Sequence, residues 1–395
     1  MQTIRVNTSS VFNSMFILTN LMVIISSFLP IFDYVAIIIF FVLSYIVRQS
    51  FSRNAIICSL CVVLTLGLGV FLSYFNGINN NSWITVIGIS FNFLLYINAA
   101  YNFPGFSTEQ QIYNVFKLVN IVGLTVCVYN VITNIGDIMS LSLTSNAYSA
   151  NFCSIYQGRN AFGFVLCIFI FSAFGLFIFI KEKKYLFSLA FFFVNLILTF
   201  SRSSILFSGI IILLFYLLDS KNSIKRKLLY TFIATLIGMI GIIIYSTYSD
   251  FIEHFLLRSD YADSNRIDYW ELALDKFADS PLFGYGPGCA LPILSVLGSN
   301  AGSSFHNTYV EIIAWGGISF IIVYIYIYAS VFKSISIIKY HNKTLYNLFL
   351  SFIIGYLIYS CFETSNYFAI GFRGVNISLF MYVFPILCSR LYSKY

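Results

Sequence analysis

The chain has 395 residues, of which 59% are hydrophobic, 19% aromatic and only 9% charged, and its formal net charge is +7. Charged residues are too few to cover a water-soluble globule of this size, so the composition excludes an ordinary soluble enzyme and indicates a membrane protein. We expect no nucleic-acid partner.

A helix needs about 20 apolar residues to cross a hydrocarbon core roughly 30 Å thick, and runs of about this length recur along the chain. Backbone polar groups find no water in lipid, so continuous apolar runs without strict alternation predict helices rather than a barrel. Twelve spans are predicted, to within about one: 12–29, 32–47, 55–75, 83–100, 112–132, 161–180, 185–200, 203–218, 228–247, 308–331, 345–361 and 375–393. The first lacks a cleavage site, so we expect it to be retained.

These runs predict an all-α polytopic membrane protein with about twelve transmembrane helices. The chain divides into residues 1–247 with the first nine spans, a large exterior loop over 248–307, and residues 308–395 with the last three spans. A loop of that length is expected to contain helices of its own and to carry function.

Lysine and arginine accumulate on the cytoplasmic side of membrane proteins, and their placement predicts the orientation. With both termini inside, sixteen of the 22 basic residues fall in cytoplasmic segments. The six left outside are Arg159, Arg202, Arg258, Arg266, Lys276 and Arg373. A solvated loop charge is the plain interpretation of each. Because the guanidinium fork grips phosphate or carboxylate, the exterior arginines also suggest an anionic ligand.

Within the exterior loop, "SNRIDYWELALDKFADSP" predicts an amphipathic helix that Ser264 caps and Ser280–Pro281 ends, with Arg266 in its first turn. Its apolar face is expected to contain Ile267, Trp270, Leu274 and Phe277, and to lie either on the membrane surface or on the helix bundle. The following "LFGYGPG" resembles a nucleotide fingerprint only weakly, since no strand precedes it. A tight turn that returns the loop to the helix bundle is the better prediction.

Three further residues are candidates for function. Arg202 lies in a short turn between two spans, where it either snorkels to the interface or meets an anion. His306 begins the span over 308–331; it is either a hydrogen-bonded structural residue or a general base with a near-neutral pKa. Glu311 follows about one turn further in, where an ionisable residue is a functional candidate by default.

In this order, "TFSRSSIL", "SNRIDYWELALDKFADSPLFGYGPG" and "HNTYVEIIAWGG" resemble the O-antigen ligase and polymerase superfamily of bacterial envelope glycosyltransferases. The motifs cover roughly residues 195–320. The resemblance implies a GT-C-like fold in the bacterial inner membrane with a periplasmic active site. It also implies glycosyl transfer with inversion, without a metal or other cofactor.

By this resemblance, Arg202 and Arg266 would hold the diphosphate of a polyprenyl-linked glycan, and His306 would activate the acceptor hydroxyl. Arginines that stabilise the charge developing on the leaving diphosphate could replace a divalent metal. Arg159, in "QGRNAFGF", adds a third cationic contact. The remaining substrate-binding candidates are Asn307, Glu311 and Tyr285.

Polymerase and ligase share these motifs because they use the same donor. We favour an O-antigen polymerase, which moves the growing glycan from undecaprenyl diphosphate to a sugar hydroxyl of a lipid-linked repeat unit. The ligase alternative would transfer the glycan to lipid A core. A transporter or flippase for the lipid-linked sugar is the alternative from another class; it predicts ionisable residues deep within spans and interrupted helices, whereas Asp33, Lys117 and Glu311 are expected near span ends.

Candidate partners are the lipid-linked donor and acceptor, membrane lipid, a chain-length regulator and a flippase. The sequence leaves the sugars, the linkage and the oligomeric state open. A disulfide between Cys153 and Cys289, both in exterior loops, also stays open.

Overall fold

The computed structural model of the protein describes residues 8–26, 51–78, 80–139, 152–156, 158–232, 265–297, 304–369 and 372–393. Within these ranges the chain forms helices joined by turns, with no strand. It groups into two compact units, each assembled from distant segments. Unit 1 draws on residues 1–115, 266–341 and 360–395, and unit 2 draws on residues 116–265 and 342–359.

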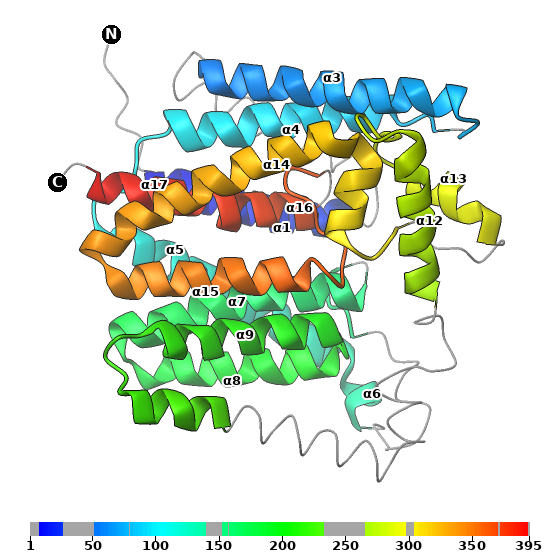
Figure 1. The fold of residues 1–395 in the computed structure, drawn as a ribbon. Coiled ribbons are helices and arrows are strands. Elements are labelled where there is room, and N and C mark those ends of the chain that lie inside the picture. The colour runs from blue at the N-terminus through cyan, green and yellow to red at the C-terminus, as the bar shows by residue number, and fades with distance from the viewer. Residues whose placement is uncertain are drawn as a thin grey trace. The chain divides into compact units, whose positions relative to one another are not determined.

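Unit 1 is built on long helices that pack along one another (Figure 1). In chain order its helices are α1 (Thr8–Ser26), α3 (Arg53–Phe75), α4 (Trp83–Asn102), α12 (Asn265–Asp279), α13 (Ala290–Leu294), the short η3 (Ser295–Leu297), α14 (Thr308–His341), α16 (Phe372–Ile377), the π-helix η4 (Ser378–Val383) and α17 (Phe384–Tyr392). α3 pairs with α4, and α14 packs on α3 and α17. Ser52 caps α3 because its Oγ accepts from the Ala55 amide at 3.1 Å.

Unit 2 surrounds one helix that is apolar on all sides. Its helices are α5 (Glu109–Thr133), whose first residues belong to unit 1, α6 (Ile135–Met139), α7 (Arg159–Ile180), α8 (Lys183–Leu198), α9 (Arg202–Leu218) and α15 (Lys343–Tyr359). α7 is buried continuously from Ala161 to Leu176, as expected of a helix in a bundle interior. The rings of Phe171 and Phe352 join α7 to α15, with centroids 4.2 Å apart.

Among the described residues, six helices are long and apolar enough to cross a membrane: α3, α4, α5, α7, α14 and the stretch Arg373–Tyr392. Thr8–Leu18, Arg202–Leu218 and Lys343–Tyr359 are shorter apolar helices. The predicted span over 32–47, and residues 233–247 of another, lie outside the described ranges. The structure therefore supports a multi-pass membrane protein.

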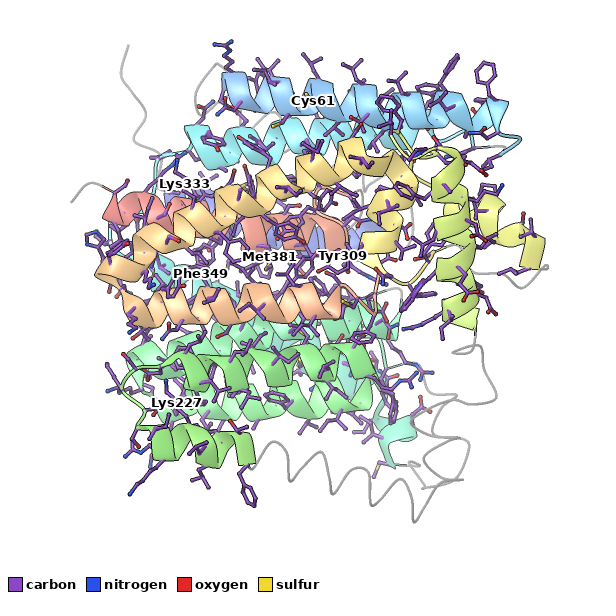
Figure 2. All side chains as sticks on the ribbon, viewed as in Figure 1. Cys61, Lys227, Tyr309, Lys333, Phe349 and Met381 are labelled. Carbon is purple, nitrogen blue, oxygen red and sulfur yellow. The ribbon has the colours of Figure 1, made fainter. Side chains whose placement is uncertain are left out.

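α3 carries the lipid-facing pattern expected of such a protein, because its apolar side chains are exposed. Leu60 and Leu64 are 57% and 63% exposed. Figure 2 shows Cys61 on this exposed helix, whereas Met381 of the π-helix is buried. Exposed apolar side chains are unfavourable in water, but contact with lipid tails carries no such cost.

The helix that follows His306 departs from the prediction in two respects. α14 ends at His341, ten residues beyond the predicted end of the span at residue 331, so Lys333 and Lys339 lie on the helix rather than in a loop. Its backbone is also broken at Gly317, where φ is 59° and ψ is −152°. His306 therefore precedes a short helical segment over 308–316, and the longer helix begins only after the break.

The helix expected within residues 248–307 forms where predicted. α12 ends at Asp279, directly before the predicted Ser280–Pro281 stop. Tyr269 and Ala273 are buried, whereas Ile267 and Leu274 of the predicted apolar face are 62% and 49% exposed. These two side chains are therefore not packed against the described protein. Ser264 lies outside the described residues.

Candidate functional site

The glycine-rich turn after α12 packs its backbone against the break in α14. The amides of Tyr285 and Gly286 each donate to the last carbonyls of the 308–316 segment, those of Ala314 and Trp315, at 2.8 Å. In return, the Ile318 amide donates to the Pro281 carbonyl at 2.9 Å. A Cβ at Gly317 would collide with that same carbonyl. The predicted tight turn toward the bundle is confirmed, and it fixes the 308–316 segment to α12.

Tyr285 has a structural position inside this turn. Its side chain is fully buried, and its hydroxyl donates to the Lys276 carbonyl of α12 at 2.8 Å. Burial, and then the nearby Asp279 carboxylate, raise the pKa of Tyr285 to about 12. The hydroxyl thus stays protonated and bonded to α12, so Tyr285 shapes the site rather than facing it.

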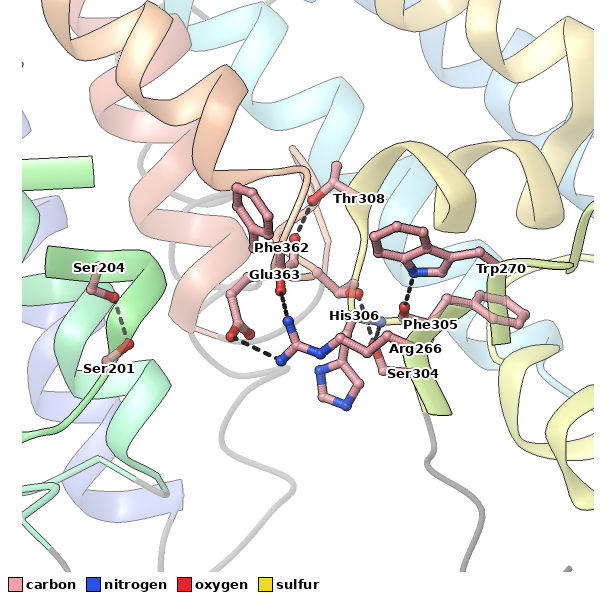
Figure 3. A network of polar contacts seen from close by, with 11 residues as sticks. Ser201, Ser204, Arg266, Trp270, Ser304, Phe305, His306, Thr308, Phe362 and Glu363 are labelled. Atoms are coloured by element: carbon pink, nitrogen blue, oxygen red, sulfur yellow. Dashed lines mark hydrogen bonds and ion pairs between the residues drawn. The ribbon is translucent and has the colours of Figure 1, made fainter. Parts of the chain in front are cut away.

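Arg266 reaches from the first turn of α12 to the segment after α15. Its Nη1 donates to the Phe362 carbonyl at 3.0 Å, and its Nη2 lies 3.9 Å from Glu363 Oε1 (Figure 3). One turn further along α12, Trp270 Nε1 donates to the Phe305 carbonyl at 2.9 Å. One face of α12 therefore connects the segment around 305 with that around 362.

The 360–365 segment wraps around the start of α14. The Thr308 amide donates to the Ser360 carbonyl, and the Thr308 hydroxyl donates to the Glu363 carbonyl, both at 2.8 Å. Asn307 caps the helix, because its Oδ1 accepts from the amides of Tyr309 at 2.9 Å and Val310 at 3.1 Å. The side-chain oxygen of Asn307 is thereby committed to the helix start.

Glu311 is buried and ties the same segments together. Its Oε2 accepts from the Phe305 amide at 3.3 Å and from the Thr364 hydroxyl at 3.2 Å. The Ser304 hydroxyl, 3.5 Å from the same oxygen, lies 2.7 Å from that of Thr364. A buried carboxylate with several donors orders the backbone around it, so Glu311 holds the loop that carries His306.

His306 occupies a strained backbone position between these anchors. Its φ is 52°, in the left-handed region that side chains other than glycine seldom adopt. The conformation is held on one side by the Phe305 contacts and on the other by Thr308, and its amide donates to Ser304 Oγ at 3.2 Å. Figure 3 draws its imidazole next to the Arg266 side chain. Four other described residues that are not glycine also have a positive φ, so the contacts around His306, rather than its φ alone, make it a candidate.

Unit 2 carries the other two candidate arginines at the starts of neighbouring helices. Arg159 is the first residue of α7 and is half-buried; Arg202 is the first residue of α9 and is exposed. The two helix starts are in contact, because a Cβ at Gly163 would lie 2.8 Å from Ser201 Cβ. Helix N-termini carry partial positive charge, so this end of unit 2 suits an anion. The turn between α8 and α9 is as short as predicted, three residues, but Arg202 begins α9 rather than lying in the turn.

The structure thus brings Arg266, His306, Asn307 and Glu311 together in unit 1, and it adds Glu363 and Thr364, which the sequence analysis missed. The signal available in the sequence was the polar stretch "ETSN" in a short loop otherwise flanked by apolar residues. Nothing in the sequence pairs this loop with Arg266, which lies 96 residues earlier.

These helices support a multi-pass membrane protein, and the polar site at the start of α14 places a cation, Arg266, beside an imidazole, that of His306. Residues 187–325, about a third of the chain, match the model of a family described as O-antigen ligase. A comparison with curated proteins finds no match. The family match confirms the resemblance to the O-antigen ligase and polymerase superfamily.

The matched range contains Arg202, Arg266 and His306, but not Arg159 or Glu363. It supports a glycosyltransferase of the ligase or polymerase type in lipopolysaccharide biosynthesis and does not separate the two. Both Cys153 and Cys289 are free thiols. Within the described residues, no three or more His, Cys, Asp or Glu side chains are grouped so that they could hold a metal ion.

Proposed function

We propose that the protein is an O-antigen polymerase that extends a polyprenyl-diphosphate-linked glycan at the outer face of the inner membrane. The observation that carries the proposal is the joint anchoring of Arg266 and His306 by one network in unit 1, inside the segment that matches the family. A cation for a leaving phosphate and a base for an attacking hydroxyl are the two groups that glycosyl transfer from a diphosphate needs.

In the proposed reaction, the oxygen of an acceptor sugar hydroxyl attacks the anomeric carbon of the donor glycan. The bond between that carbon and the diphosphate oxygen breaks, and the electron pair leaves with the polyprenyl diphosphate. The hydroxyl proton passes to the His306 imidazole, and the Arg266 guanidinium stabilises the negative charge that develops on the departing oxygen. Attack opposite the leaving group inverts the configuration. None of these steps requires a metal.

Glu363 acts in this proposal as a positioning residue. Its carboxylate is buried while the Arg266 side chain is 26% exposed, so the guanidinium can meet a ligand from the open side while Glu363 holds it from the closed side. Since the Phe362 carbonyl also accepts from Arg266, two fixed acceptors orient the fork before the donor arrives.

Arg202 and Arg159 are proposed as phosphate-binding residues on the evidence of unit 2 alone. Both open helices whose starts are in contact, and the family resemblance extends to Arg202. Asn307 and Tyr285, whose polar atoms cap or brace helices, are assigned to shaping the site, and Glu311 to ordering the loop before His306.

The test is to delete the gene and examine the surface glycan. A polymerase is indicated if lipid A core carries a single repeat unit and long chains disappear. A ligase is indicated if the core carries none and long chains remain on the carrier lipid. The ligase is the second candidate because the matching family is described by that activity. Intact long chains on the core would contradict both.

Two features match the interrupted helices that the transporter alternative predicts: the break in α14 and the π-helix Ser378–Val383. The first is occupied by backbone from residues 281–286, and the polar anchor Thr308 lies at the start of α14. We therefore favour the enzyme. Transport activity would leave repeat units on the inner leaflet after deletion, which carrier-lipid labelling detects.

A further inference from the structure

A groove of about 740 Å³ lies between α5 and α8, entirely within unit 2. Its walls are Lys117, Asn120, Ile121, Leu124 and Val128 from α5, and Lys184, Tyr185, Phe187, Ser188 and Phe191 from α8. The volume falls in the range of about 300–1,000 Å³ common for ligand sites. Neither the family resemblance nor the proposed reaction uses this groove.

Lys117 is an ionisable residue inside a membrane-spanning helix. α5 begins at Glu109, so Lys117 lies about 12 Å along the helix axis at 1.5 Å per residue. No hydrogen bond or ion pair to Lys117 is found within the part of the chain that the structure describes. A lysine within an apolar helix that has no partner among the described residues is a functional candidate.

A second lysine and two polar side chains lie at the same end of the groove. Lys184 stands in the first turn of α8, where it pairs with Glu182 and lies 5.1 Å from the centre of the Tyr185 ring. Asn120 Nδ2 donates to Ser188 Oγ at 3.4 Å across the two helices. Beyond this polar end, the walls are apolar side chains alone. The groove is therefore lined by lysines at one end and by apolar side chains along the rest of its length.

We propose that this groove binds one anionic phospholipid, with its phosphate at Lys117 and Lys184 and an acyl chain along Ile121, Leu124 and Val128. The matching charge is the argument for this occupant: a phosphate would give Lys117 an anionic partner, Lys184 adds positive charge beside it although it also pairs with Glu182, and an acyl chain would cover the apolar walls. The lysine-rich end is the one predicted to face the cytoplasm, where anionic lipids concentrate. Snorkelling alone would account for Lys117 but not for an open groove beneath it.

The experiment is lipid retention after reconstitution of the full-length protein in nanodiscs of equal phosphatidylglycerol and phosphatidylcholine. The protein is released into mild detergent and weighed with its bound lipid by native mass spectrometry. The wild type is expected to retain one phosphatidylglycerol in preference to phosphatidylcholine. Lys117→Gln should reduce that retention about ten-fold, because one charge-assisted contact to phosphate is lost.

Two further variants test the apolar part of the groove separately from its charge and provide a control for nonspecific effects of substitution. Leu124→Trp fills the apolar part without changing any charge and should also lose the lipid. Lys183→Gln is the matched control: Lys183 is exposed, adjoins Lys184 and does not line the groove, so retention should equal that of the wild type. The comparison is valid if all variants elute from size-exclusion chromatography as equally monodisperse peaks.

Equal retention by the wild type and Lys117→Gln would overturn the proposal, as would equal retention of phosphatidylcholine and phosphatidylglycerol. A final arm adds a polyprenyl phosphate at the same mole fraction as phosphatidylglycerol. Displacement of phosphatidylglycerol by that lipid would reassign the groove to the carrier, and would overturn a phospholipid site. Continued preference for phosphatidylglycerol supports it. Neither outcome depends on whether the protein polymerises or ligates glycan.

Discussion

Replacing Arg266 by lysine tests whether the fork of the guanidinium, rather than its charge, serves the reaction. The guanidinium donates to the Phe362 carbonyl at 3.0 Å while its other terminal nitrogen faces Glu363 at 3.9 Å. A lysine ammonium is a point charge that cannot keep both acceptors and still present planar donors to a phosphate. Arg266→Lys should therefore lose at least one charge-assisted hydrogen bond of about 1.5–3 kcal/mol.

If that loss falls on the transition state, the rate of chain extension drops about ten- to one-hundred-fold. Arg266→Ala should abolish extension. The assay is complementation of a deletion strain, with polymer yield and length measured on gels and protein amount by immunoblot. Lys276→Ala is the control on the same helix, because its side chain only pairs with exposed Asp279, an interaction worth little. Near-normal polymer from Arg266→Lys at normal protein level would refute the argument from fork geometry.

His306→Ala should remove polymer while the protein stays in the membrane; near-normal chain length and yield would disprove the general-base role. Glu363→Gln should lower polymer yield less than Arg266→Lys does, because the Phe362 carbonyl still orients Arg266. A loss as complete as in Arg266→Ala would show that Glu363 takes part in the chemistry. Gly317→Ala should destabilise the protein by at least about 1–3 kcal/mol through the left-handed backbone and the collision with Pro281, and this is measured as a lower Tm in detergent. Gly209→Ala, at a helical site with open space around it, should be neutral or stabilising. Equal Tm values for the two variants would contradict the packing of the glycine-rich turn against the break in α14. Arg202→Lys should reduce polymer yield at unchanged protein level if Arg202 grips phosphate bidentately, whereas full activity would reduce its role to charge alone.

The sequence predicted those features that depend on local pattern. α12 and its stop at Ser280 follow from helical spacing and a proline, and the return of the glycine turn follows from residues that tolerate a positive φ. Apolar length also located most of the helices that the structure describes. In each case the determining information lies within about 20 consecutive residues.

Features that depend on distant partners were not predicted. The apolar spacing of α12 predicted the helix and its apolar face, but it did not predict the hydrogen bonds that Arg266 and Trp270 make with two remote segments. The break at Gly317 likewise requires the carbonyls of Pro281 and Leu282 to replace acceptors within the helix. A hydropathy pattern records apolar length and does not record which backbone amides find partners elsewhere.

The resting contact between Arg266 and Glu363 bears on how an anionic donor would be admitted. The Phe362 carbonyl holds the guanidinium whether or not Glu363 pairs with it, so an incoming phosphate can compete for the charge of Arg266 without moving the side chain. At 3.9 Å the ion pair is long, and partial exposure of the arginine weakens it further. A diphosphate carries more negative charge than one carboxylate and accepts the fork bidentately, so the exchange favours the donor. In the proposed reaction, Glu363 would keep the arginine oriented and partly neutralised between turnovers, which would limit binding of weaker anions at the same position.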